Sequence, residues 1–180
     1  MDSAELATRA RRAYERGRWR MALQIAPLVA VLVALSFVAA GGSTLTALAG
    51  AALLATATVL RWRGGALGAG VRAGLAAGLV PFTLLLVLKC SAHTMCAVGM
   101  CMSHCTPFCG IGGLVAGVLI AVRARRHAAH LVAFLAAGSA IAALTGLLGC
   151  FVGGVTGIAW MLAGELAATL PAFAVELRRR

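Results

Sequence analysis

The stretch MALQIAPLVAVLVALSFVAA, residues 21–40, holds no charged side chain and has the length of about 20 residues that a helix needs to cross a bilayer. Other apolar runs follow it, at residues 44–60, 73–88, 111–122, 131–150 and 155–175. The run at 111–122 is short, and it reaches a spanning length only if it includes residues 106–110. The pattern predicts an all-α, polytopic membrane helical bundle of about six transmembrane helices.

The composition agrees with this prediction. Apolar residues make up 62% of the chain and charged residues 12%, against roughly half and about a quarter in soluble globular proteins. Small residues at four-residue spacing indicate close contact between helices in lipid. They occur in three sets: Gly70, Gly74 and Gly78; Gly113 and Gly117; and Gly149, Gly153 and Gly157.

The net charge of +11 is carried by short basic blocks between the apolar runs, so direct binding of nucleic acid is not expected. Every arginine lies in residues 1–20, 61–72, 123–130 or 176–180, whereas the other connections hold only Lys89. Because basic residues stay on the cytoplasmic side, this segregation predicts that both termini face the cytoplasm. The chain is therefore expected to be a multi-pass protein of the cell inner (plasma) membrane.

The predicted organisation has three parts. Residues 1–20 form a cytoplasmic, basic juxtamembrane helix that contacts anionic lipid or docks a cytoplasmic protein. Residues 21–177 form the six-helix transmembrane domain, which contains an external, cysteine-rich loop at residues 89–110. The lipid bilayer is thus the first expected partner.

All the cysteines fall on the predicted external side. Five lie in the loop and the sixth follows the fifth span; they are Cys90, Cys96, Cys101, Cys105, Cys109 and Cys150. Thiols outside the cytoplasm tend to form disulfides. Six cysteines allow 15 pairings, and spacing does not choose among them. A bridge from the loop to Cys150 would tie the third and fourth helices to the fifth and sixth.

A soft-metal site or a switching disulfide are the alternatives for the same residues. His93 and His104 lie between the cysteines, and the loop has no carboxylate for hard cations, so the donor set suits Zn or Cu. No C-x2-C pattern occurs. A helical stretch would place Cys101 and Cys105 on one face, with Pro107 positioned to interrupt the helix before Cys109. Structural disulfides, a redox switch and a metal site all remain open.

Glu165 is an acid near the middle of the sixth predicted span, where a charged carboxylate is costly and a functional role is a default hypothesis. The alternative is a neutral packing residue that is hydrogen-bonded to a neighbouring hydroxyl. Thr83, Ser139 and Thr145 are the candidate partners.

The layout resembles the small six-helix bacterial anti-sigma-factor membrane proteins of the NrsF-like kind, which have external cysteine sites after the third and fifth helices. Here these sites match Cys90–Cys109 and Cys150, although five loop cysteines stand where one is expected. The resemblance implies a membrane regulator that holds a cytoplasmic sigma factor and releases it on a redox or metal signal. Residues 1–20 and the inner loops would bind that partner.

Other function classes remain beside the regulator. A soft-metal-ion transporter would capture its ion at the outer cysteines, and a structural membrane protein would use them to staple its outer loop. An enzyme is not expected, because no catalytic constellation and no C-x-x-C redox motif is evident.

Overall fold

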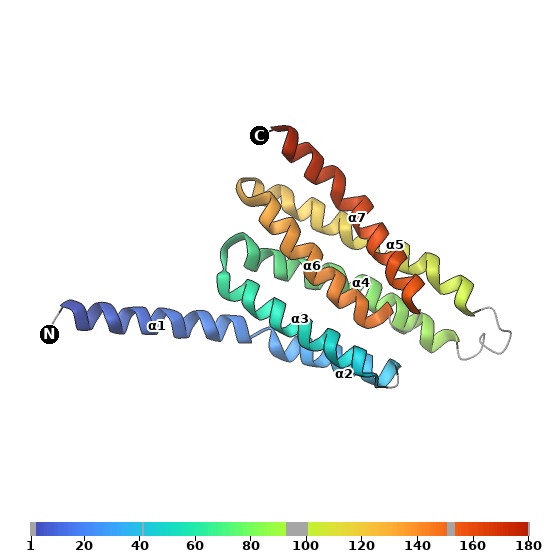
Figure 1. Ribbon diagram of the computed structural model, residues 1–180, viewed down its shortest axis with the longest axis horizontal. Helices are drawn as coiled ribbons and strands as arrows, with labels where there is room; N and C mark the ends of the chain where they lie inside the picture. Colours follow the sequence, from blue (N-terminus) through green and yellow to red (C-terminus); the bar gives the residue numbers. More distant parts are fainter. Residues whose placement is uncertain (1–2, 41, 93–100, 151–153, 180) are drawn as a thin grey trace.

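The computed structural model describes residues 3–40, 42–92, 101–150 and 154–179 (Figure 1), and this part of the chain is all-α. Its helices, in chain order, are α1 Ser3–Leu23, α2 Ala26–Ala40, α3 Thr44–Arg63, α4 Gly65–Ala92, α5 Cys101–Ala124, the 3-10 helix η2 Arg125–His130, α6 Leu131–Cys150 and α7 Gly154–Arg179.

The first apolar run is divided between two helices. Helix α1 ends at Leu23 and α2 starts at Ala26. The cause is Pro27, which has no N–H to donate to the Leu23 carbonyl and whose ring clashes with that carbonyl in a continuous helix. Helix α1 projects beyond the rest of the bundle (Figure 1).

The α3–α4 connection is much shorter than the predicted basic segment 61–72. Helix α3 begins after Ser43, whose Oγ accepts a hydrogen bond of 3.1 Å from the Thr46 N–H. It ends at Gly64, which adopts a φ of 74° and donates its N–H to the last carbonyls of the helix. Helix α4 starts at the next residue, so Arg72 lies on α4 and not in a loop.

The predicted loop 89–110 is also partly helical. Helix α4 continues to Ala92 and α5 begins at Cys101, so residues 101–110 belong to a helix. This agrees with the expectation that the short apolar run at 111–122 is lengthened by the residues before it. Pro107 lies inside α5 without ending it.

Helix α4 packs most extensively against α6, and α5 against α7. Glycines explain both contacts. A Cβ atom on Gly74 would collide with the Gly138 carbonyl of α6, and one on Gly113 would collide with the Met161 carbonyl of α7. The expected close-contact faces at Gly70, Gly74 and Gly78 and at Gly113 and Gly117 are therefore present.

The third glycine set is not one helix face. Gly149 lies on α6 and Gly157 on α7, so the two residues belong to different helices and their four-residue register has no meaning across the connection.

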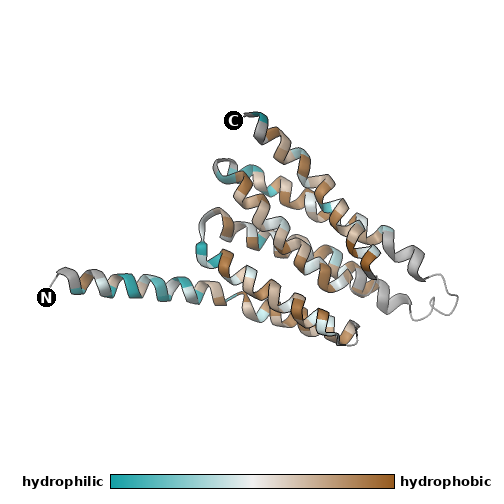
Figure 2. Cartoon of the chain, viewed as in Figure 1, coloured by the Kyte–Doolittle hydropathy of each residue, from teal (hydrophilic) through white to brown (hydrophobic). Residues whose placement is uncertain are grey.

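Six helices are long and apolar enough to cross a membrane. Many of their apolar side chains face outward, including Val38 at 86% exposure and Val155 at 82%, as the surface of a lipid-facing bundle requires. Hydrophilic residues gather along α1, at the α3–α4 turn and at the α5–α6 connection (Figure 2). The six helices thus fit a multi-pass membrane protein with its arginines at one end.

Candidate functional site: a buried sulfur cluster

Three sulfur atoms meet at the end of the bundle opposite the arginines. Cys109 Sγ lies 3.5 Å from Cys150 Sγ, and Cys150 Sγ lies 3.6 Å from Met161 Sδ. The three residues come from α5, α6 and α7 respectively, and each is at most 1% exposed. We call Cys109, Cys150 and Met161 the sulfur cluster.

Glycines bring the three helices close enough for this contact. A Cβ atom on Gly157 would lie 3.2 Å from Cys109 Sγ, and one on Gly164 would collide with the Gly110 carbonyl. Helix α7 therefore lies almost backbone to backbone against α5. This approach places Met161 beside the two thiols.

The surroundings of the sulfur cluster are apolar. Leu147, Ile158 and Leu162 pack against it. Both cysteines are free thiols in the structure. A disulfide needs an S–S distance of about 2.05 Å, so a sulfur displacement of roughly 1.5 Å would join α5 to α6. Two thiols and a thioether are also the soft donor set that Cu(I) prefers.

The other predicted ligands fall, wholly or in their side chains, outside the part of the chain that the structure describes. His93 and Cys96 lie outside the described residues. The backbones of Cys90, Cys101, Cys105 and His104 are helical, and their side chains also fall outside what the structure describes. Among the described residues no group of three or more His, Cys, Asp or Glu side chains could hold a metal ion. Among the described side chains of the predicted set, Cys109 and Cys150 are the pair that the structure brings together.

Glu165 lies one turn below the sulfur cluster, four residues after Met161 on α7. It is 3% exposed, and Ser139 of α6 faces it. Neither Glu165 Oε1 nor Ser139 Oγ has a hydrogen-bond partner in the part of the chain that the structure describes. Burial without a basic partner favours a neutral carboxyl group at this position.

The other two hydroxyls expected near Glu165 are used elsewhere. Thr83 Oγ1 donates to the Leu79 carbonyl at 2.7 Å, and Thr145 Oγ1 donates to the Ile141 carbonyl at 2.8 Å. Both bonds stay within the residue's own helix. Of the three candidates, only Ser139 faces the acid.

Met161 is the functional candidate that spacing alone does not reveal. In the sequence it is one methionine in an apolar span, 11 residues after Cys150. Its position one turn before Glu165 is the only local signal that it shares a helix face with a polar residue.

No protein-family model matches the chain, and no curated protein or solved structure is similar to it at the level of a significant match.

Proposed function

We propose that the chain is a regulatory protein of the bacterial inner membrane, with both termini in the cytoplasm, and that it responds to the redox state outside through Cys109 and Cys150. The observation that carries the proposal is the 3.5 Å contact between two fully buried thiols on different helices. Transfer of two electrons and two protons from the thiols to an external oxidant, such as a small-molecule disulfide that is reduced to two thiols, would join α5 to α6 by a disulfide.

The orientation follows from the charges. Both thiols lie at the end of the bundle opposite the arginine-bearing connections, and such connections stay in the cytoplasm. The thiols then lie near the external face, where oxidants are available and disulfides persist.

The signal can reach the cytoplasm through the α5–α6 hairpin. The cytoplasmic end of this hairpin is η2, which carries Arg125 and Arg126. The His127 ring stacks on the Phe134 ring of α6 with the ring centroids 4.7 Å apart, and this contact holds η2 in place. A covalent bond at one end of two packed helices would change their crossing angle. The short connection at the other end would then move with the helices. Glycine-mediated contact with α4 limits how this strain is absorbed.

The partner would be a cytoplasmic protein, and the resemblance to anti-sigma factors makes a sigma factor the first candidate. Helix α1 offers a basic surface for it, with Arg9 and Arg11 exposed and paired only with glutamates of the same helix. The η2 connection adds further arginines on the same side of the bundle.

A soft-metal role is the second candidate, and Met161 favours it. A redox pair needs two thiols only, whereas the thioether 3.6 Å from Cys150 completes a three-sulfur set for Cu(I). In this reading the sulfur cluster captures the ion, either to signal its presence or as the first step of transport.

The regulator is tested by capturing cytoplasmic partners with the full-length protein from oxidised and reduced membranes. Cys150→Ser is expected to give the reduced pattern under both conditions, and Cys96→Ser, which removes a different external cysteine, is the control. A partner set that is the same in all six samples contradicts the regulator. Topology is checked separately, because a cysteine introduced at exposed Arg125 should react with an impermeant reagent only after permeabilisation.

A further inference from the structure

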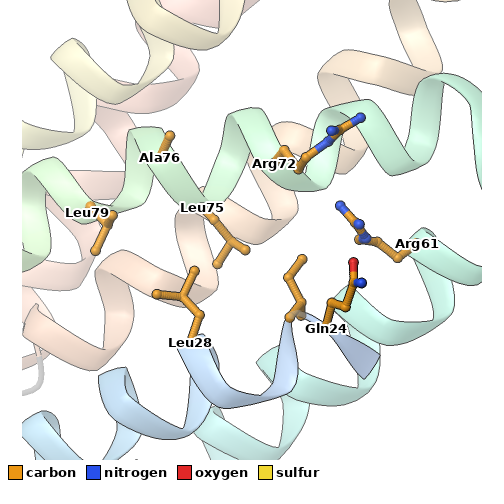
Figure 3. Close-up of a pocket in the computed structure, with 8 residues that line it drawn as sticks. Gln24, Leu28, Arg61, Arg72, Leu75, Ala76 and Leu79 are labelled. Carbon is orange, nitrogen blue, oxygen red and sulfur yellow. The ribbon is translucent and has the colours of Figure 1, made fainter. Parts of the chain in front are cut away.

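A pocket opens between α2, α3 and α4 at the arginine-rich end of the bundle (Figure 3), with a volume of about 360 Å³. It does not touch the sulfur cluster. Its lining residues are Gln24, Ile25, Leu28, Arg61, Arg72, Leu75, Ala76 and Leu79.

The lining changes from charged to apolar along the pocket. Arg61 and Arg72, which come from neighbouring helices, lie with Gln24 at one end of the pocket, whereas Leu28 and Leu79 lie toward the other end (Figure 3). The pocket therefore has a cationic head and an apolar tail.

Among the described residues, neither guanidinium group has an anionic partner. The ion pairs among the described residues join Glu5 to Arg9 and Glu15 to Arg11, all on α1. The Nε atom of Arg61 donates to the Met21 carbonyl at 3.3 Å, which orients this guanidinium but leaves its charge unbalanced. Two cations that line one pocket beside an apolar wall favour the binding of an anion there.

A second pocket of about 260 Å³ shares the same two arginines. It adds Arg18 and Tyr14 to the lining. Arg18 is held in place because it donates to the Trp62 carbonyl and its guanidinium lies 5.1 Å from the Trp62 ring centroid. Three arginines from three helices thus surround one region.

We propose that Arg61 and Arg72 bind the phosphate of an anionic phospholipid of the phosphatidylglycerol class, with one acyl chain along Leu28, Leu75 and Leu79. The site rests on the membrane location and orientation proposed above. Charge complementarity accounts for the phosphate, and the apolar tail accounts for the hydrocarbon, which free phosphate lacks. A headgroup with its own ammonium would fit less well, because it would add a third cation to the pair.

The bound lipid would join α2 and α3 to the rest of the bundle. These two helices form one edge of the fold, with α4 beside α3. A headgroup held jointly by α3 and α4 would link that edge, and α1 that projects from it, to the helices that carry the sulfur cluster.

The test titrates short-chain phosphatidylglycerol into the full-length protein in a neutral detergent, with phosphatidylcholine of the same chain length and inorganic phosphate as comparisons. Phosphatidylglycerol is expected to bind at least about tenfold more tightly than either. The double variant Arg61→Gln/Arg72→Gln is expected to lose that preference. The control Arg63→Gln/Arg125→Gln removes the same charge from exposed positions outside the pocket and is expected to keep it.

If both double variants lower the affinity for phosphatidylglycerol equally, general charge attraction explains the binding and the proposed site is overturned. Binding of inorganic phosphate as tight as that of the lipid would overturn the lipid as occupant. Should the first variant not fold, hydrogen exchange on the unmodified protein decides: phosphatidylglycerol should slow exchange at residues 59–76 more than phosphatidylcholine does, and equal exchange would overturn the proposal.

Discussion

Cys109 Sγ and Cys150 Sγ lie 3.5 Å apart, although 41 residues separate them in the chain. The contact brings together one of the pairs that six cysteines allow. It also places that pair inside the bundle, on two helices that end in a shared arginine-bearing connection. In the proposed account the pair is the element that senses redox state.

The close packing of α4 on α6 predicts a selective sensitivity to small substitutions. Gly74→Ala should destabilise the folded protein by about 1–3 kcal/mol, because the new Cβ atom collides with the Gly138 carbonyl. Gly17→Ala on α1 is the matched control, since nothing lies within 4 Å of its added Cβ. Thermal unfolding in detergent compares them, and equal stability of the two variants would contradict the packing described here.

A substitution at Met161 distinguishes the metal hypothesis from the redox hypothesis. Met161→Leu keeps a similar side-chain volume and removes the thioether, so Cu(I) affinity should fall at least roughly tenfold if the sulfur cluster binds the ion. Competition with a chromogenic Cu(I) chelator under reducing conditions measures this. Unchanged affinity in the variant would remove Met161 from the site, while disulfide formation between the two cysteines should be the same in both proteins.

Glu165 is expected to act as a neutral packing residue beside Ser139. Glu165→Gln should then change the free energy of unfolding by less than about 1 kcal/mol and leave partner capture intact, because Gln has the same shape without the ionisable group. Glu165→Lys should destabilise the protein by roughly 3 kcal/mol. Loss of partner capture or of metal flux in the Gln variant would instead assign the carboxyl group a role in the protein's activity.

The number of membrane-span helices could be predicted from the sequence because most apolar runs have about the length of a membrane span, and the short run at 111–122 reaches it with residues 106–110. The ends of the helices were harder to predict. Arg61, Arg63 and Arg72 suggested a loop, yet the chain turns at Gly64 and Gly65, both at positive φ, because a basic side chain at a helix end can extend to the interface while its backbone stays helical.

The site was predicted only in part. A bridge from the loop to Cys150 was one expected possibility, but Cys109 could not be singled out, since its choice depends on the α5–α7 approach at Gly113 and Gly164. The position of Ser139 opposite Glu165 depends likewise on how α6 and α7 are rotated, and local spacing does not determine this rotation.

The most direct test of the redox account is a search for the bridge between Cys109 and Cys150 in protein from oxidised membranes. Free thiols are alkylated and the chain is cut with trypsin, which cleaves after Lys89, Arg123 and Arg126. Cys109 and Cys150 then lie on different fragments. The account predicts that these fragments are linked before reduction and separate after it, that Cys109→Ser abolishes the link, and that Cys105→Ser retains it. Fragments that are separate before reduction, or a link that persists in Cys109→Ser, would contradict it.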